Sequence, residues 1–517
     1  MREIIAMGVM QVANAYILVV MGILCAKVAG FLRDAVFASY FGTGIESDIY
    51  FQIFSIASLV FTAVGSALST LIIKNINKPV NSQEGAQEDF AAHFMRRISF
   101  MIILITAVLY AFAKPLVKVL LPNLAGESFN LAVRIMYIML PSFLFICIAY
   151  MMSGLLQNRR VFFTPSIMSL PYNVIVICVL FLGIKDIEKI SIITTVGWFL
   201  HIVIQLPDFY RKGYRFIPKG KSRASDSSMG NATETVFIFI SGLMLQLCFM
   251  TDKIFAGTDA GVVSTLSYAS NLFITFSGLF VVAMSSVVFP AISQNYEHGE
   301  MDYVRELIRY MIKLMLSIFA FYLIAVVLFG DFAIAFIYER GQFTHEDTMR
   351  VTLMFIVYSF AIFGYLAQNV LNKLFYIAGK YKITVIGALV VVALNAAADF
   401  VLVPYGGMLS AALSTTVLLS IYAVVIAVLL KKVIGSYVTK ALLWALGKIG
   451  ISSAVTVTCV LALGQFLPES FSMGKGLERI VLFAVSLAVY AVCMLLTGML
   501  KDLFTTPLAR TAQNRKV

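Results

Sequence analysis

The stretch KVAGFLRDAVFASYFGTGIESD, residues 27–48, places four ionisable side chains within or beside an apolar run long enough to cross a membrane. They are Lys27, Arg33, Asp34 and Asp48. An ionised side chain at membrane depth costs about 3 kcal/mol or more, so it usually faces a wet cavity or a partner. We therefore predict a functional site here. The alternative is an interfacial loop whose charges reach the headgroups.

The composition indicates a membrane protein that crosses the bilayer many times. Of 517 residues, 60% are hydrophobic and only 13% are charged, and the mean hydropathy is +0.92. The fold class predicted is therefore all-α and polytopic. The net charge of +12 falls largely in short loops, where it sets orientation and meets anionic lipid, so no nucleic-acid partner is expected. The six cysteines lie in apolar runs without metal spacing.

Apolar runs of about 20 residues predict about fourteen transmembrane helices. The turn Pro404-Tyr405-Gly406-Gly407 divides two of them, and Pro141, Pro165 and Pro171 are expected to bend others. The N-terminus reads as a retained span and not as a signal peptide. Lysine and arginine gather in alternate loops, which places both the N- and C-termini in the cytoplasm.

Two halves of the chain resemble each other. A shift of 218 residues aligns Asp34 with Asp252 and Tyr50 with Tyr268. We predict an N-lobe of six spans at 1–215, a basic cytoplasmic loop at 216–232, a C-lobe of six spans at 233–432, and two added spans with a cytoplasmic tail at 433–517. Repeats with an even number of spans are related by a pseudo-two-fold axis along the membrane normal. Such transporters bind substrate between the halves and alternate access.

The charges of the first half suit an anion. Lys27 and Asp34 are seven residues apart and share a helical face, with Arg33 about 100° away. A guanidinium binds phosphate through a bidentate fork, so we expect a phosphate-type ligand. The alternative is an Arg33–Asp34 or Lys27–Asp48 ion pair that holds spans together.

Oxygen ligands in the second half suit a cation. Asn395 and Asp399 are four residues apart on one face, Thr415 lies in the next span, and Asp252 begins the repeated motif. These hard ligands could bind Na⁺ or carry H⁺. The alternative is that Asn395 and Asp399 bond to neighbouring helices and Asp252 pairs with Lys253.

Other features give no sign of an enzyme. The charged segment YERGQFTHEDT, residues 338–348, contains Thr344 and Asp347 in a capping-box spacing before a span. There is no Walker A motif and no nucleophile beside a base. A transporter without a cofactor, other than a coupling ion, is expected.

Several motifs together resemble one family. GFLRDAVFASYFG at 30–42, TDKIFAG at 251–257, VVFPAIS at 287–293 and KLFYIAGKYKI at 373–383 are similar to motifs of the MurJ/MviN family. Its members are lipid II flippases of the multidrug/oligosaccharidyl-lipid/polysaccharide exporter superfamily. The resemblance implies a multi-pass protein of the bacterial cytoplasmic membrane, with a cationic cavity between two lobes and two extra C-terminal spans. Members of the family move a polyprenyl-pyrophosphate-linked glycan from the inner to the outer leaflet for peptidoglycan synthesis, and the resemblance implies the same activity here.

The resemblance also assigns residues. Lys27, Arg33, Asp34 and Asp48 match the substrate-binding positions of the family, with lysine where arginine is usual. A second set matches its sodium-site pattern: Asp252, Asn395, Asp399 and Thr415. Membrane lipids, the lipid-linked substrate and the cell-wall synthesis machinery are the implied partners.

The sequence departs from the family in spans two and eight. Phe61 and apolar neighbours near Val64 replace an expected arginine and glutamate in span two, and Ser270, Asn271 and Ile274 replace charged residues in span eight. Alternatives are therefore a flippase for another lipid-linked polysaccharide, a multidrug or cation antiporter of the superfamily, and a scaffold for cell-wall enzymes.

Overall fold

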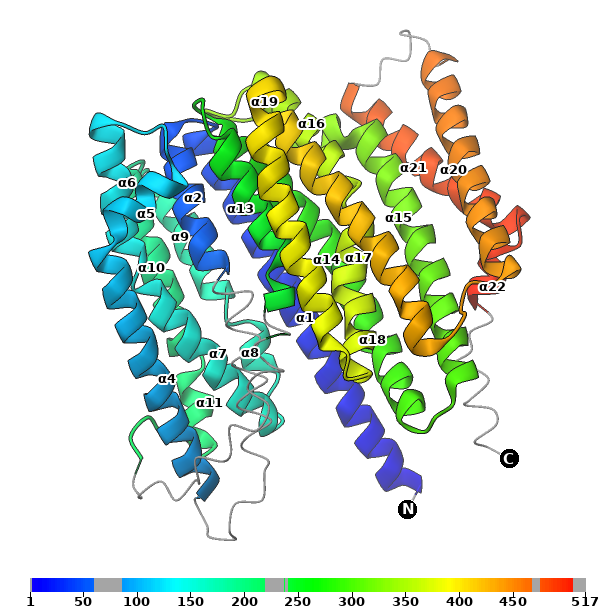
Figure 1. The fold of residues 1–517 in the computed structure, drawn as a ribbon, viewed down its shortest axis with the longest axis horizontal. Helices are drawn as coiled ribbons and strands as arrows, with labels where there is room; N and C mark the ends of the chain where they lie inside the picture. The colour runs from blue at the N-terminus through cyan, green and yellow to red at the C-terminus, as the bar shows by residue number, and fades with distance from the viewer. Residues whose placement is uncertain (1, 60–85, 219–236, 238–239, 467–474, 505–517) are drawn as a thin grey trace. The chain divides into compact units, whose positions relative to one another are not determined.

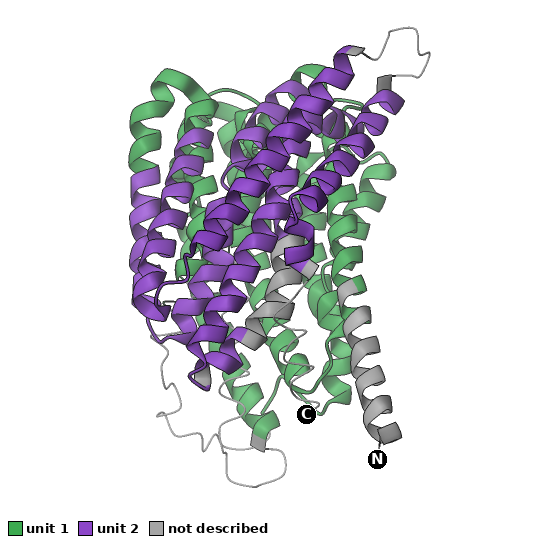
Figure 2. Cartoon of the chain, turned by 90° about the vertical axis from the view of Figure 1, so that its right-hand side faces the viewer, with its two compact units in different colours: residues 1–268, 338–347, 396–411 green, residues 269–337, 348–395, 412–517 purple. Residues whose placement is uncertain are grey.

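The computed structural model describes residues 2–59, 86–218, 237, 240–466 and 475–504, and all regular structure in these ranges is helical (Figure 1). Contacts within the chain define two compact units (Figure 2). Unit 1 comprises Met1–Tyr268, Tyr338–Asp347 and Ala396–Ala411, and unit 2 comprises Ala269–Ile337, Thr348–Asn395 and Ala412–Val517.

Eleven described helices lie entirely in unit 1. They are α1 (Arg2–Phe41), α2 (Ile45–Leu59), α4 (Ala86–Ala111), α5 (Ala113–Leu120), α6 (Gly126–Met139), α7 (Ser142–Asn158), α8 (Phe163–Ser166), α9 (Leu170–Phe181), α10 (Ile187–Val203), α11 (Leu206–Arg211) and α13 (Met244–Ala256).

The remaining helices lie in unit 2 or have residues in both units. They are α14 (Val262–Glu297), α15 (Met301–Tyr338), α16 (His345–Ser359), α17 (Ile362–Leu366), the π-helical turn η3 (Ala367–Leu371), α18 (Asn372–Ile377), α19 (Tyr381–Ile434), α20 (Lys440–Phe466), α21 (Lys475–Leu496) and α22 (Met499–Phe504).

Unit 1 is built around α10. This helix packs against α9, α7, α6 and α2, while α1 runs along α8 and α9, and α13 packs on α2. Local signals explain where α10 starts, because the Asp186 carboxylate accepts hydrogen bonds from the Glu188 and Lys189 backbone N–H groups. These contacts bring α1, α2, α9 and α13 together within one unit.

In unit 2 the two C-terminal helices pack against α15. Tyr490 of α21 donates a hydrogen bond to the Ser317 carbonyl oxygen of α15 at 2.7 Å, and buried Met494 and Met499 complete the contact. Outward side chains of these helices remain apolar, as in Trp444, which is 74% exposed. Such exposure suits lipid as the surrounding solvent.

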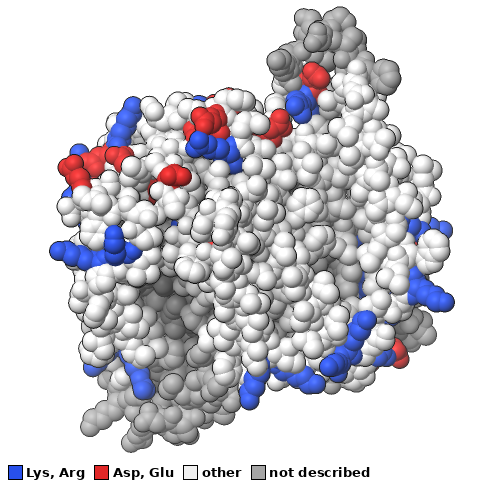
Figure 3. Space-filling view, turned by 45° about the horizontal axis from the view of Figure 1, so that its top comes forward, with Lys and Arg blue, Asp and Glu red and all other residues white. Residues whose placement is uncertain are grey.

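Length and composition identify seven helices that can cross a membrane in the described part of the chain, or eight if one bent pair is a single span. The bent pair is His345–Ser359 with Ile362–Ile377, at 51°. The protein is thus a polytopic helical membrane protein, as predicted, whereas the number fourteen is not confirmed. Charged side chains gather toward the margins of the face in Figure 3 and leave a broad uncharged zone between them.

The predicted break between Pro404 and Gly407 is confirmed, whereas bends at Pro141, Pro165 and Pro171 stay a prediction. α19 contains 54 residues, about 80 Å at 1.5 Å per residue, which exceeds one bilayer crossing. Non-helical angles at Gly407 (φ 56°, ψ −143°) divide it at the turn predicted from Pro404 to Gly407. Pro141 separates α6 from α7, and Pro171 lies in the first turn of α9.

Some predictions fall outside the described residues. These include Phe61 and Val64 in the second half of the second predicted span, and residues 219–232 of the basic loop. The proposed lobe boundaries also stay a prediction.

Candidate functional site

Arg33 and Asp34 form an ion pair on α1 inside unit 1. The Arg33 Nη2 and Nε atoms donate to Asp34 Oδ1 at 2.6 and 3.0 Å. Their side chains are 14% and 13% exposed. The Arg33–Asp34 pair considered from the sequence is therefore present, and it orients the guanidinium in a largely buried position.

Helix α9 supplies a second support for Arg33. Arg33 Nη1 donates to Asn173 Oδ1 at 3.1 Å, and Asn173 Nδ2 donates to the Ala26 carbonyl oxygen of α1 at 3.2 Å. The Arg33 Cζ atom also lies 4.9 Å from the Tyr172 ring centroid and 5.8 Å from that of Phe54. Sequence reasoning missed Asn173, Tyr172 and Phe54 because they lie far from Arg33 along the chain.

The guanidinium keeps hydrogen-bonding capacity. Arginine has five N–H donors, and the three bonds to Asp34 and Asn173 use three of them. Two donors remain on the Nη atoms. Binding of an anion by these two donors would leave both supports of the guanidinium in place.

Lys27 lies two turns before Asp34 on α1 and is half-buried. Its ammonium forms no ion pair within 4 Å among the described residues. The Lys27–Asp48 pair considered from the sequence is not formed, because the Asp48 carboxylate has other partners.

Asp48 binds the start of α14. Its Oδ2 atom accepts from the Gly261 N–H at 2.6 Å and its Oδ1 atom from the Ser264 N–H at 2.7 Å. These are unpaired donors of the first turn of a helix, and a carboxylate there also interacts favourably with the helix dipole. The carboxylate of Asp48 thus binds Gly261 and Ser264 at the start of α14, and it forms no ion pair with Lys27 or Arg33 among the described residues.

Two loops of unit 1 meet close to Asp48. The Gln342 N–H donates to the Ser39 carbonyl oxygen at 2.9 Å, and Thr43 donates to Asp347. Gly341 has φ +62°, and a Cβ atom there would collide with the Ser39 carbonyl oxygen. The predicted capping box is confirmed, since the Asp347 N–H donates to Thr344 Oγ1 at 3.3 Å and Thr344 N–H donates to Asp347 at 2.8 Å.

The predicted sodium ligands are all buried. Asp252, Asn395, Asp399 and Thr415 are each 0% exposed. In unit 2, Thr415 Oγ1 donates to Asn395 Oδ1 at 3.0 Å. In unit 1, α13 and the 396–411 segment of α19 lie together, with the Phe255 and Phe400 rings 6.3 Å apart. The described residues contain no group of three or more His, Cys, Asp or Glu side chains able to hold a metal ion.

Lys253 is a further buried charge that sequence reasoning did not assign to a site. It follows Asp252 on α13, is 6% exposed, and donates through Nζ to Ser55 Oγ of α2 at 3.1 Å. The Asp252–Lys253 pair considered from the sequence is not within 4 Å.

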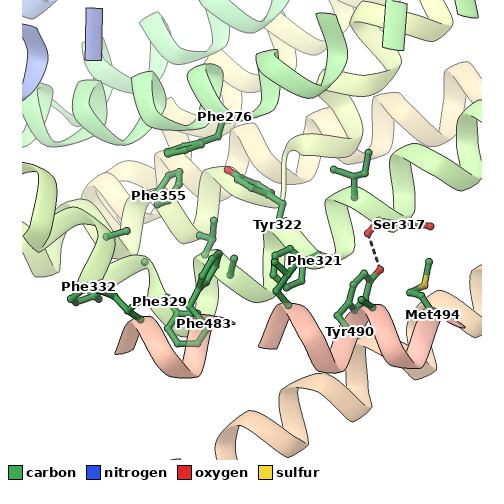
Figure 4. Close-up of a pocket in the computed structure, with 18 of the residues that line it drawn as sticks. Phe276, Ser317, Phe321, Tyr322, Phe329, Phe332, Phe355, Phe483, Tyr490 and Met494 are labelled. Carbon is green, nitrogen blue, oxygen red and sulfur yellow. Dashed lines mark hydrogen bonds between the residues drawn. The ribbon is translucent and has the colours of Figure 1, made fainter. Parts of the chain in front are cut away.

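Unit 2 contains an apolar cavity of about 730 Å³ between α15 and α21, with contributions from α14, α16 and α22 (Figure 4). Aromatic rings form much of its wall, where Phe321 and Phe329 of α15 lie against Phe483 of α21 at 6.0 and 5.6 Å between centroids. The polar side chains of its lining are those of Ser317, Tyr322 and Tyr490. The cavity suits a hydrocarbon chain.

The fold is similar to that of solved membrane transporters. A solved lipid II flippase MurJ in an inward closed conformation matches with a TM-score of 0.78, 20% identity, and coverage of 94% of this chain and 100% of that one. A multidrug resistance MATE family transporter of the MOP superfamily matches with a TM-score of 0.59 and 14% identity, over 82% of this chain and 95% of the other. The chain therefore shares the fold of these two solved structures.

The sequence comparisons give the family. The model of the family described as Lipid II flippase MurJ matches residues 37–506. A probable lipid II flippase MurJ of Rhizobium tropici is 23% identical over 411 residues, 76% of each chain. The lipid II flippase MurJ of Thermosipho africanus is 23% identical over 399 residues, 76% of this chain and 80% of that one. The chain belongs to the MurJ family of lipid II flippases, which confirms the predicted resemblance and transporter function.

Proposed function

We propose that this protein carries lipid II from the inner to the outer leaflet of the bacterial cytoplasmic membrane, with Arg33 and Lys27 binding the pyrophosphate. Membership of the family supports lipid II as the substrate. The observation that carries the assignment of the site is the buried Arg33 guanidinium, which is fixed on two sides and retains two N–H donors. The cell-wall synthesis machinery stays a predicted partner.

The arrangement around Arg33 suits reversible binding of an anion. Asp34 offsets the charge of Arg33, so the guanidinium can stay buried when no substrate is bound. A phosphoryl oxygen can approach the two remaining N–H donors as a charge-assisted hydrogen-bond acceptor. Lys27, half-buried and without an ion pair among the described residues, adds attraction for a second phosphoryl group. Binding that is specific but not too tight allows release on the opposite side.

The apolar cavity of unit 2 supports a lipid substrate. A polyprenyl chain has no hydrogen-bonding groups, and the cavity wall of phenylalanines and aliphatic side chains offers it a matching surface. In this proposal the cavity between α15 and α21 accommodates the polyprenyl chain of the substrate.

The coupling ion is proposed to be Na⁺ or H⁺, with Asp252, Asn395, Asp399 and Thr415 as its ligands. Their complete burial supports this role, because carboxylates at membrane depth are rarely kept without a functional partner. Binding of a cation would favour one of two alternating conformations, and the gradient of that cation would then drive the cycle.

The membrane topology is part of the same proposal. The protein would have about fourteen spans and both termini in the cytoplasm, with an N-lobe at 1–215, a C-lobe at 233–432 and two added spans at 433–517. The basic residues of alternate loops support this orientation.

A transport assay with charge-matched variants tests the function. Purified protein is placed in liposomes with fluorescent lipid II, and the fraction that reaches the outer leaflet is followed with a membrane-impermeant quencher. The double variant Arg33→Gln/Asp34→Asn removes both charges, so no unpaired carboxylate is left behind, and transport should fall at least about tenfold.

Arg134→Gln is the matched control. Arg134 forms an exposed ion pair with Glu188 at 2.7 Å, so its loss should leave transport unchanged. Wild-type rates in the double variant would refute the site. Transport of a different lipid-linked saccharide, with none of lipid II, would refute the substrate.

A further inference from the structure

Lys253 occupies an unusual position for a lysine. It lies on α13 at 6% exposure, one turn before the end of the helix at Ala256. Its Nζ atom donates to Ser55 Oγ at 3.1 Å, and that hydroxyl in turn donates to the Phe51 carbonyl oxygen at 2.7 Å. The Ser55 hydroxyl proton is therefore engaged, and an oxygen lone pair faces the ammonium group.

The charge of Lys253 is not neutralised by a close ion pair. In the described ranges no carboxylate oxygen lies within 4 Å of its Nζ atom. Asp252 is its neighbour in sequence, but adjacent helical side chains point about 100° apart. One hydroxyl group satisfies only one of the three ammonium donors. Asp252 acts on Lys253 as a nearby negative charge without direct contact. The ammonium group thus loses hydration with no anion bound directly to it, which favours binding of an anionic ligand.

Lys253 and Arg33 contact consecutive residues of α2. The Phe54 ring lies 5.8 Å from the Arg33 Cζ atom, and Ser55, the next residue, accepts the hydrogen bond from Lys253. All of these groups belong to unit 1. The two cations therefore contact neighbouring positions of α2, Arg33 from α1 and Lys253 from α13, whose side chains point about 100° apart around that helix.

We propose that Lys253 is a third cationic ligand of the substrate pyrophosphate, binding the phosphoryl group that Arg33 does not hold. The proposal rests on the proposed function. Asp34 already offsets Arg33, so Lys253 supplies net positive charge beside that pair. A pyrophosphate carries separate anionic oxygens on two phosphorus atoms, which can contact cations from two helices together.

Binding of defined lipids to the purified protein in nanodiscs tests this role. The probes are undecaprenyl pyrophosphate, undecaprenyl phosphate and undecaprenol. Lys253→Met should bind the pyrophosphate lipid about ten- to hundredfold more weakly than wild type, because one charge-assisted hydrogen bond is lost. It should bind undecaprenol like wild type, because the polyprenyl contacts are unchanged.

Two variants of Ser55 separate ligand binding from a structural role. Ser55→Ala removes the hydrogen bond between α13 and α2 but leaves the ammonium charge, so affinity should change less than about threefold. Ser55→Asp leaves the lysine in place and gives it an internal counterion, so affinity should fall about tenfold. This second result does not depend on the folding of a lysine variant.

The outcomes are distinguishable. Wild-type affinity in Lys253→Met or in Ser55→Asp overturns the role of Lys253 and leaves the flippase proposal intact. Equal losses in Ser55→Ala and Lys253→Met also overturn it, because they would show that the contact only holds α13 to α2. Failure of wild-type protein to bind undecaprenyl pyrophosphate would overturn the proposed function and this role together.

Discussion

Replacing Asn173 by alanine removes a support of Arg33 while leaving both charges of the Arg33–Asp34 pair in place. The lost contact is the hydrogen bond from Arg33 Nη1 to Asn173 Oδ1 at 3.1 Å, together with the bond from Asn173 to the Ala26 carbonyl oxygen at 3.2 Å. A hydrogen bond to a charged group contributes about 1.5–3 kcal/mol. If this energy positions the guanidinium for its anion, affinity for the pyrophosphate lipid should fall about 10- to 100-fold.

A second variant, Asn173→Asp, separates a role in anion binding from a purely structural role. The carboxylate is close in shape to the amide but places a second negative charge on the guanidinium. The group around Arg33 then changes from neutral to net negative, so the affinity should fall further than in Asn173→Ala. A purely structural role for Asn173 predicts the opposite order. Both variants lose the bond to the Ala26 carbonyl oxygen, but the introduced carboxylate can still pair with Arg33 and hold α1 to α9, which alanine cannot.

The assay is equilibrium binding of undecaprenyl pyrophosphate, followed by lipid II transport in liposomes for the same variants. Raised salt should weaken wild-type binding, since part of the interaction is between charges. The reasoning is refuted if Asn173→Asp binds the lipid as well as wild type, or if Asn173→Ala loses thermal stability without losing affinity.

Other contacts of the described residues lead to three further predictions. Asp48→Ala removes the acceptor of the Gly261 and Ser264 N–H groups, and the protein should lose about 1–2 kcal/mol of stability in thermal unfolding in detergent, with unchanged lipid affinity; a large loss of affinity instead would place Asp48 in the substrate site. Gly341→Ala forces a Cβ atom against the Ser39 carbonyl oxygen at φ +62° and should lower the unfolding temperature by the equivalent of about 1–3 kcal/mol, whereas Gly44→Ala, with nothing within 4 Å, should have little effect. Asp399→Asn should abolish the dependence of lipid II transport on a Na⁺ or H⁺ gradient; preserved dependence in that variant would exclude Asp399 as an ion ligand.

The sequence predicted the chemistry of this site better than its geometry. Arg33 and Asp34 could be singled out because charged side chains are costly inside an apolar run, and their ion pair follows from their adjacency. Asn173 could not be found in this way, since its contact with Arg33 joins positions 140 residues apart. Only the packing of α1 against α9 brings the two together.

Asp48 and Lys253 show the limits of reading charge alone. A substrate-binding role for Asp48 stays a prediction. Its described partners include the backbone N–H groups of Gly261 and Ser264 at the start of α14, which any residue type can supply and no side-chain pattern reveals. Lys253 was considered only as a partner for Asp252, because the two are adjacent. The orientation of α13 toward α2 directs Lys253 to Ser55 instead.

Helix boundaries depended on similarly local information. The break at Gly407 was predictable because Pro404 and two glycines form a turn signal within an apolar run. The number of membrane crossings was less predictable from the sequence. Hydropathy alone does not show that α9 is 12 residues long or that α16 and α17 meet at a bend. Backbone geometry decides such cases, and it is set by packing against neighbouring helices.

The adjacency of Asp252 and Lys253 on α13 has a thermodynamic consequence. A helix moves as a stiff rod, so a rotation that changes the surroundings of the aspartate turns the lysine by the same angle relative to Ser55. If a cation binds at one and an anion at the other, α13 links the two equilibria directly. Linkage then requires reciprocity: whatever factor the cation imposes on affinity for the lipid, the lipid imposes on affinity for the cation.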